Sequence, residues 1–289
     1  MEIVIVSGKG GTGKSTISAA FATLKNKVVV ADCDVDAANL PILFNPSRED
    51  ENVFVSGQKA VIDYSLCSNC GLCLNYCRFD AIFVAKWKVT ISEFSCDGCK
   101  LCSLICPDSA ISMIENDKSR IYSGSFRNGK MVYGSLAPGE DNSGKLVNKV
   151  REKARELSKL NNIETIIIDG PPGIGCSAIS SITGVDRVLI VTEPTISGVH
   201  DFQRLLQIMD NFHYSPWVMI NKFDLNVEMS DEIENYCRKN NISFAGKLPF
   251  DANVVEAMVN KKSIIEYAPD SEIANQIAAI YDKITTMML

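Results

Sequence analysis

Residues 3–16 read IVIVSGKGGTGKST. An apolar run of β-branched residues leads into a glycine-rich loop, and a segment of helical periodicity then extends from about Ser15 to Leu24. Glycines let backbone N–H groups approach an anion, and a helix that begins at the end of the loop adds the positive end of its dipole. A strand, a loop of the form GxxxxGK[ST] and a helix, in this order, predict a phosphate-binding loop.

Each position of this loop has an expected role. Lys14 is expected to contact the β- and γ-phosphates of a nucleotide, and the Ser15 hydroxyl is expected to bind Mg²⁺. The other expected nucleotide contacts in the loop are Gly8, Gly10, Gly11, Thr12, Gly13 and Thr16. The loop therefore predicts a nucleotide site that uses magnesium.

Strand-like apolar runs alternate with helical segments along most of the chain. The further strand-like runs are 28–31, 165–168, 188–191 and 218–220, and the helical segments are 145–160, 201–212 and 230–239. This alternation is typical of parallel sheets whose strands are joined by crossover helices. The sequence therefore predicts a doubly wound α/β fold with helices on both faces of a mainly parallel sheet.

Composition narrows the class of protein. The net charge of −6 argues against a protein that mainly binds nucleic acid, because phosphate contacts need clustered Lys and Arg. No apolar run is long enough to cross a bilayer, and the N-terminus lacks the features of a signal peptide. The final segment, Ile273 to Met288, predicts a helix packed on the core, since only Lys283 is basic. We expect a cytoplasmic protein without a stable membrane anchor.

An inserted domain is expected at residues 58–118, between the two parts of the nucleotide domain at 1–57 and 119–289. Eight of the eleven cysteines gather there, in two runs of the form Cys-x-x-Cys-x-x-Cys-x-x-x-Cys. The runs are Cys67, Cys70, Cys73 and Cys77, then Cys96, Cys99, Cys102 and Cys106. The second run follows the first at an offset of 29 residues, and flanking apolar residues recur at the same offset. This recurrence indicates an internal repeat. Because cytosolic disulfides are rare, metal binding is the natural interpretation.

These runs resemble bacterial two-cluster ferredoxins, in which the fourth cysteine of each run ligates the other cluster. The resemblance implies a small α+β domain with two [4Fe–4S] clusters. One cluster would use Cys67, Cys70, Cys73 and Cys106, and the other Cys96, Cys99, Cys102 and Cys77. Zinc is the competing interpretation, but a zinc site gives no reason for the third and fourth cysteines of each run. Pro107 follows the second run, whereas Arg78 replaces the proline of the first.

The loop itself resembles the deviant Walker A motif of the MinD, ParA, Mrp and nitrogenase iron-protein group, because of its additional lysine, Lys9. In that group the lysine reaches the nucleotide of a partner subunit, which implies an ATP-bound homodimer here. Two aspartate-containing segments, 32–40 (the first switch) and 169–173 (the second switch), resemble those of the group. The resemblance implies that Asp34 orients the attacking water, that Asp32 belongs to the Mg²⁺ shell and that Asp169 is the Walker B residue.

The sequence identifies the residues that contact the nucleotide base less specifically than those that contact the phosphates. Asn221 opens an Asn-Lys-Phe-Asp segment that resembles the guanine-reading motif of GTPases, but an Asn at this place contacts adenine in MinD-like proteins. Pro249 lies in a segment that resembles their adenine-side loop. ATP is therefore favoured over GTP.

Cys176 stands seven residues after Asp169, which resembles the position of a cluster ligand in the nitrogenase iron protein. That protein needs a second cysteine per subunit, and none lies between Cys106 and Cys176. A packing role is therefore favoured over a cluster shared between subunits.

The resemblance implies ATP binding and hydrolysis to ADP. The leading hypothesis is an ATP-dependent dimer switch coupled to the clusters, for electron transfer or for assembly of a metal centre in a client, so that a metalloenzyme or redox protein is the expected partner. The alternative is a non-catalytic scaffold that carries clusters and uses nucleotide to control dimerisation. Amidation, as in cobyrinic acid diamide synthases, is disfavoured because little chain remains after Lys247 for a glutaminase domain.

Overall fold

The structure is a computed structural model, and it describes residues 1–140 and 142–286. The chain divides into two compact units. The first comprises residues 1–51, 121–134 and the chain from 144 onward, and the second comprises 52–120 with 135–143. The segment 135–143 thus belongs to the second unit, although it lies outside the interval expected for the inserted domain.

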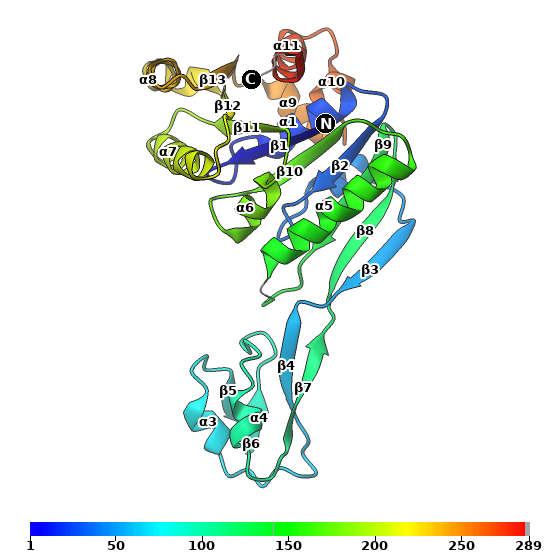
Figure 1. The fold of residues 1–289 in the computed structure, drawn as a ribbon, viewed down its shortest axis with the longest axis vertical. Coiled ribbons are helices and arrows are strands. Elements are labelled where there is room, and N and C mark those ends of the chain that lie inside the picture. The colour runs from blue at the N-terminus through cyan, green and yellow to red at the C-terminus, as the bar shows by residue number, and fades with distance from the viewer. Residues whose placement is uncertain (141, 287–289) are drawn as a thin grey trace. The chain divides into compact units, whose positions relative to one another are not determined.

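A sheet with helices on both sides forms the first unit (Figure 1). Its strands are β1 (Glu2–Ser7), β2 (Val28–Asp32), β3 (Asp50–Phe54), β8 (Ser119–Phe126), β9 (Gly129–Ser135), β10 (Ile166–Pro172), β11 (Arg187–Thr192), β12 (Trp217–Asn221) and β13 (Ser243–Leu248). Within the described residues the order is β13-β12-β11-β1-β10-β2-β9-β8-β3. Every pair from β13 to β9 is parallel. The predicted mainly parallel α/β fold is confirmed.

Helices cover both faces of the parallel strands. They are α1 (Lys14–Thr23), α2 (Leu40–Phe44), α5 (Ser143–Leu160), α6 (Cys176–Ile182), α7 (Ile196–Asn211), the 3₁₀ turn η1 (Phe223–Leu225), α8 (Val227–Lys239), α9 (Ala252–Val259), α10 (Ile264–Tyr267) and α11 (Glu272–Thr286). In Figure 1, α1, α10 and α11 lie on one side of the central strands, whereas α5, α6 and α7 lie on the other. In the described part of the chain, no helix combines the length and apolarity needed to cross a membrane.

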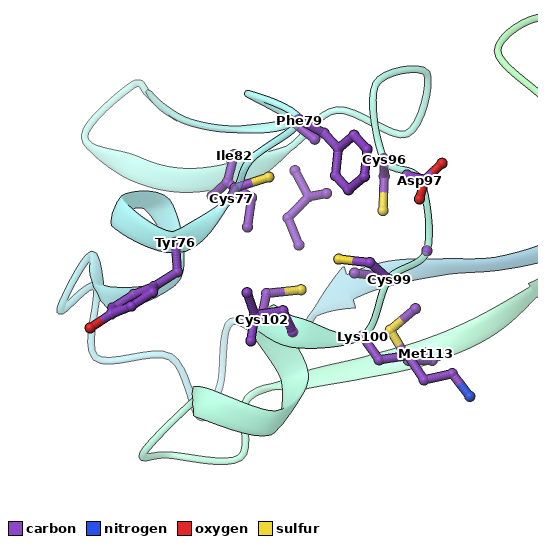
Figure 2. Close-up of a pocket in the computed structure, with 15 residues that line it drawn as sticks. Tyr76, Cys77, Phe79, Ile82, Cys96, Asp97, Cys99, Lys100, Cys102 and Met113 are labelled. Atoms are coloured by element: carbon purple, nitrogen blue, oxygen red, sulfur yellow. The ribbon is translucent and has the colours of Figure 1, made fainter.

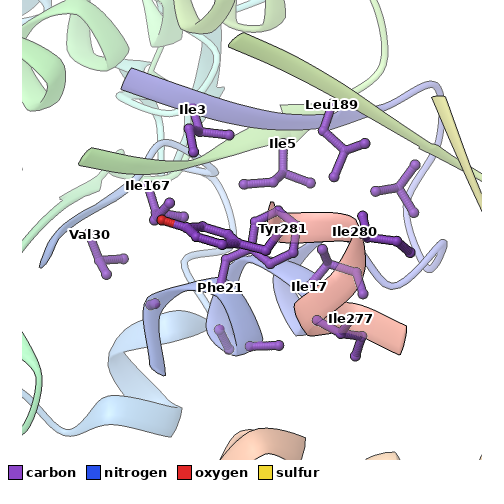
Figure 3. Packing of buried hydrophobic residues seen from close by; sticks show 14 of the residues in the cluster. Ile3, Ile5, Ile17, Phe21, Val30, Ile167, Leu189, Ile277, Ile280 and Tyr281 are labelled. Atoms are coloured by element: carbon purple, nitrogen blue, oxygen red, sulfur yellow. The ribbon is translucent and has the colours of Figure 1, made fainter. Parts of the chain in front are cut away.

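The apolar core follows from the period of two along each strand. Ile3 and Ile5 face α1 and α11, where the rings of Phe21 and Tyr281 meet edge to face with centroids 5.0 Å apart (Figure 3). Each fully buried isoleucine contributes about 1.5–3 kcal/mol. The predicted C-terminal helix is confirmed, since Ile277 and its neighbours on the same face are buried in this core. Met288, the last residue of that prediction, lies outside the described residues.

Glu2, at the start of β1, is held by two arginines of α5. Nη2 of Arg151 and Nη2 of Arg155 each donate a hydrogen bond to Oε2 of Glu2 at 2.9 Å. Arg151 also donates to the carbonyl oxygens of Ser180 and Thr183, at the end of α6. Burial raises the pKa of Glu2, but the hydrogen bonds and charges of Arg155 and Arg151 outweigh it and bring this pKa below its ordinary value of 4.5. The ionised carboxylate thus ties β1, α5 and α6 together.

We expect Glu2→Gln to reduce the acid dependence of the free energy of unfolding. A carboxylate whose pKa is lowered by folding contributes stability above its unfolded pKa, and this contribution is lost as the pH falls through the folded pKa. Urea unfolding between about pH 3 and about pH 7 measures the difference between wild type and variant, which should shrink toward acid pH. The matched control is Glu152→Gln, which removes an exposed ion pair with Lys149 and should change little. A Glu2→Gln difference that stays constant with pH would contradict the prediction.

The second unit consists of two antiparallel strand pairs and two short helices. Its elements are β4 (Gly57–Ile62), α3 (Leu72–Tyr76), β5 (Ile82–Ala85), β6 (Lys88–Ile91), α4 (Leu101–Ile105) and β7 (Ile111–Asn116). Strand β4 pairs antiparallel with β7, and β5 with β6. The backbone repeats as well, because left-handed residues precede both helices at equivalent positions, Gly71 and Lys100. The predicted internal repeat therefore extends to the backbone conformation.

Candidate functional site

The phosphate-binding loop joins the end of β1 to the start of α1, as the sequence predicts. A cavity of about 570 Å³ lies over it. Its lining consists of loop residues together with residues of both switches and of α6: Ser7, Lys9, Gly10, Gly11, Thr12, Gly13, Lys14, Ser15, Thr16, Asp34, Asp36, Ala37, Asn39, Pro171, Pro172 and Ser177. Most of the predicted nucleotide contacts therefore surround one open space. Gly8 lies behind it, where a Cβ would come within 2.4 Å of the Cβ of Asp201.

Lys14 and Asp169 form the charged centre of this cavity. Nζ of Lys14 lies 3.1 Å from Oδ1 of Asp169 and 3.9 Å from Oδ2 of Asp34. The hydroxyl of Ser18 donates a second hydrogen bond to Oδ1 of Asp169 at 2.9 Å. Within the described residues, the buried Oδ2 of Asp169 has no hydrogen-bond partner. An unpaired buried carboxylate oxygen is costly, so this atom is available to a ligand or to the hydration shell of a cation.

The two predicted aspartates of the first switch have different surroundings. Asp32 is fully buried, and its oxygens accept hydrogen bonds from the backbone N–H of Asp34 at 3.1 Å and of Leu40 at 3.0 Å. Burial and the charge of Asp169 raise the pKa of Asp32 well above its usual range. Burial also raises the pKa of Asp34, although Lys14 opposes this rise. Asp34 borders the cavity, whereas Asp32 lies behind it and fixes the backbone of the switch.

Lys9 is held within its own chain. Its Nζ lies 2.5 Å from Oε1 of Glu193 and donates hydrogen bonds to the hydroxyls of Thr195 at 3.0 Å and Ser197 at 3.1 Å. Glu193 also forms an ion pair with Lys222, whose Nζ lies 3.5 Å from Oε2 of Glu193. Glu193 therefore connects the loop to the segments that follow β11 and β12.

The expected base-side residues border a second cavity, of about 220 Å³, next to the loop. Asn221 and Pro249 both line it, together with apolar residues of α9 and α11. The side-chain amide of Asn221 donates to the carbonyl oxygen of Thr12 at 2.8 Å and so braces the loop. Gly13 has a φ of +92°, and a Cβ there would meet that amide nitrogen at 2.3 Å, so this position requires glycine.

Four cysteines of the second unit line one small cavity. They are Cys77, Cys96, Cys99 and Cys102, and Figure 2 shows their sulfur atoms directed into the same space. Ala60, Ala81, Ile82 and Ile91 contribute apolar walls. Cys77 belongs to the first sequence run and the other three to the second. This grouping is the one that the resemblance to two-cluster ferredoxins implies for the second cluster.

Three of the remaining cysteines of the repeat, Cys70, Cys73 and Cys106, lie near one another. Burial raises the pKa of Cys73, and the nearby thiols of Cys106 and Cys70 raise it further. The backbone N–H of Ala110 donates to Sγ of Cys106 at 3.3 Å. Among the described residues, no three His, Cys, Asp or Glu side chains are placed to hold a single metal ion. In a cluster each thiolate binds a different iron, so its ligands surround a volume instead of converging on one point.

The other cysteines have separate environments. Cys33 is fully buried beside Asp32, and burial raises the pKa of its thiol. Cys176 is exposed at the start of α6.

Comparison with known proteins supplies the family of the first unit. The profile of the CobQ/CobB/MinD/ParA nucleotide binding domain matches residues 3–264. The chain belongs to this family. Among relatives, an uncharacterised protein of Methanocaldococcus jannaschii is 35% identical over 292 residues, covering 98% of this chain and 96% of its own length.

The chain is also similar to members of the family whose names state a role. The septum site-determining protein MinD of Thermotoga maritima is 28% identical and covers 76% of this chain and 64% of its own length. The structure of MinD from Pyrococcus horikoshii, complexed with Mg-ADP, has a TM-score of 0.60 at 18% identity and covers 99% of this chain and 96% of its own. MinD from Pyrococcus furiosus, a cell division ATPase, has a TM-score of 0.59 at 18% identity, with coverage of 98% and 97%. These structures share the fold of the family.

Sequence reasoning assigned no role to Glu193 or Lys222, which the structure places at the family's phosphate-binding loop. Nζ of Lys222 donates to the carbonyl oxygen of Gly11 at 3.1 Å. The sequence does contain an indication of the role of Glu193, because this residue directly follows a buried strand. The carboxyl ends of parallel strands lie at the edge of the sheet where ligands bind. A single acidic residue after a strand is too common to be selected without its partners.

Proposed function

We propose that the chain is a magnesium-dependent ATPase whose nucleotide state controls formation of a homodimer, and that its second unit carries two [4Fe–4S] clusters. The observation that carries the ATPase part is the charged centre of the loop cavity. Lys14 there contacts both Asp169 and Asp34, and membership of the nucleotide-binding family supports the same reading. Because the two units are parts of one chain, ATP binding and the clusters can be coupled.

Magnesium fits the acidic residues of the cavity. Burial, and after it the charge of the neighbouring buried carboxylate of Asp169, raise the pKa of Asp32. A divalent cation near these two carboxylates relieves the repulsion between them, and the unpaired Oδ2 of Asp169 can accept a hydrogen bond from a water of its shell. In this proposal the Ser15 hydroxyl is the direct protein ligand, while the nucleotide phosphates complete the shell.

The base-side cavity supports ATP over GTP. Asp224, the last residue of the Asn-Lys-Phe-Asp segment, accepts a hydrogen bond from the backbone N–H of Phe250 at 2.7 Å. That carboxylate oxygen holds the loop after β13. Asn221, in turn, braces Thr12. One oxygen of Asp224 is thus used within the protein, which disfavours its use in binding a guanine base.

We expect unlabelled ATP to displace a bound fluorescent ATP analogue at a concentration at least about tenfold lower than GTP, which corresponds to about 1.4 kcal/mol. The measurement is a competition titration with Mg²⁺ present. Asp224→Asn should keep this preference, because it retains an acceptor for the Phe250 N–H. Equal displacement by both nucleotides would contradict the assignment of ATP.

Homodimer formation is proposed from Lys9, the lysine that distinguishes this loop. In the single chain its charge is neutralised by Glu193. A partner's triphosphate offers more negative charge than one carboxylate, so ATP can draw Lys9 away from Glu193 and across an interface. Analytical ultracentrifugation with ATP should show a dimer for wild type and a monomer for Lys9→Ala.

The cluster part of the proposal rests on the four sulfur atoms that face one cavity (Figure 2). Thiolates are the ligands of iron–sulfur clusters, and an apolar wall excludes the water that would hydrolyse them. Bound clusters would supply one-electron redox chemistry or iron and sulfide for a client metalloenzyme or redox protein. Anaerobic reconstitution followed by iron and sulfide analysis tests this part. Clearly less than two clusters per chain would contradict it.

The second candidate is a cluster-carrying scaffold that binds nucleotide without hydrolysing it. The hydrogen bonds that Asp32 accepts from the backbone N–H groups of Asp34 and Leu40 favour it, because they hold the first switch in one conformation. Single-turnover hydrolysis separates the two candidates. Release of phosphate from bound ATP by wild type supports the ATPase, and stable bound ATP supports the scaffold.

A further inference from the structure

Lys59 places a positive charge inside the second unit. It lies on β4, and only 9% of its side chain is exposed. Its Nζ donates to the carbonyl oxygen of Cys96 at 2.6 Å and to that of Gly139 at 3.1 Å. Both acceptors are neutral carbonyl oxygens, so these contacts solvate the ammonium group without neutralising it. A buried ammonium is costly unless negative charge lies near it.

The neighbouring cysteine cavity is where such negative charge would be. Cys96 lines it together with Cys77, Cys99 and Cys102 (Figure 2). A [4Fe–4S] cluster on four thiolates carries net negative charge, which increases by one when the cluster accepts an electron. Net charge and burial set the reduction potential of such clusters. A fixed cation favours the more negative, reduced form.

We propose that Lys59 is the counter-charge of the cluster held by Cys77, Cys96, Cys99 and Cys102, and that it raises the reduction potential of this cluster above that of the other. The inference rests on the proposed function, because it requires that the clusters are present. Lys59 acts through position and charge, since it contacts the backbone of Cys96 and not a sulfur atom.

The two halves of the internal repeat differ in the burial of the lysine at this position. Lys59 precedes Ile62 by the same number of residues as Lys88 precedes Ile91, so Lys88 is its counterpart in the second half. Lys88 is exposed, and its Nζ lies 5.3 Å from the ring centroid of Tyr64. Water screens an exposed charge far more than a buried one. Of these two equivalent lysines only Lys59 is buried, and it contacts the backbone of the second cysteine run. Lys100 and Asp97 also line the cysteine cavity, but both are exposed, so water screens their charges.

Gly139 fixes the geometry of this contact. It belongs to the segment 135–143, and its φ of +73° suits glycine. A Cβ on Gly139 would lie 2.7 Å from the carbonyl oxygen of Phe94, so the segment lies directly against the turn that leads to Cys96. The ammonium group is thereby held between two backbone carbonyls and cannot turn toward solvent without breaking both contacts.

A potential-controlled titration of the reconstituted full chain tests the inference. Dithionite supplies one electron to each cluster without making or breaking a ligand bond, and electron paramagnetic resonance follows each reduced cluster. Lys59→Met should lower the equilibrium constant for reduction of one cluster about tenfold, equal to about 59 mV for one electron, and leave the other unchanged. Lys88→Met is the matched control and should shift neither. Lys59→Arg, which keeps the charge, should stay near wild type.

Each possible outcome bears on the inference. A fully loaded Lys59→Met chain with two unchanged potentials overturns it, and so does an equal shift of both clusters, which would indicate general loosening of the unit. If Lys59→Met does not retain its clusters, Lys59→Gln keeps hydrogen-bonding capacity without charge and carries the same expectation. A wild-type chain that holds no clusters on iron and sulfide analysis overturns the proposed function and this inference with it. The two failures are therefore distinguishable.

Discussion

Asp34→Ala is expected to reduce ATP hydrolysis by about 100-fold or more while leaving ATP binding nearly intact. Asp34 borders the loop cavity, and its Oδ2 lies 3.9 Å from Nζ of Lys14. Burial raises its pKa, which makes the carboxylate a stronger proton acceptor for an attacking water. The phosphate contacts expected from Lys14 and the loop backbone do not involve Asp34. The loss should therefore appear in kcat, measured as phosphate release, and not in the affinity for ATP.

Lys14→Ala provides the contrasting variant for this experiment. Lys14 is the buried cation of the cavity, so its removal should weaken ATP binding itself and leave the charges of Asp34 and Asp169 uncompensated. Asp34→Ala should accumulate an ATP-bound dimer on ultracentrifugation, whereas Lys14→Ala should remain monomeric. Undiminished hydrolysis by Asp34→Ala would remove this residue from the mechanism, and equal loss of ATP affinity in both variants would make it a binding residue.

The parts of the site that the sequence predicted are those encoded in local spacing. The loop of residues 8–16 and the cysteine runs are contiguous motifs, so chain geometry alone brings their residues together. The carboxyl end of a parallel strand fixes where Asp169 emerges, because its partners β1 and β2 end at the same edge of the sheet. These predictions needed only local motifs and the positions where the predicted strands end.

The sequence could not predict contacts between residues far apart along the chain. The ion pair of Lys9 with Glu193 joins two loops that only the order of strands β1 and β11 brings together. The contact of Lys59 with Gly139 likewise depends on the segment 135–143 joining the second unit. Such contacts depend on the order of the strands in the sheet and on which side chains are buried. A local sequence motif specifies neither the strand order nor the burial.

Cys77→Ser is expected to remove one of the two proposed clusters, and the cluster that it removes should be the one on the second cysteine run. Cys77 follows α3 and belongs to the first run in sequence, but it lines a cavity with Cys96, Cys99 and Cys102. Iron content should therefore fall by about half. Cys176→Ser, at the exposed start of α6, is the control and should retain both clusters.

Double variants decide how the cysteines are shared, because two substitutions at one site are not additive whereas those at separate sites are. Cys77→Ser with Cys99→Ser should lose no more iron than Cys77→Ser alone, since both residues line the same cavity. Cys77→Ser with Cys70→Ser should lose nearly all of it. The reverse result would mean that each run ligates its own cluster, which contradicts the grouping in the cavity. Retained ATP binding in every variant shows that the first unit is still folded, so that iron loss reports on the cysteines alone.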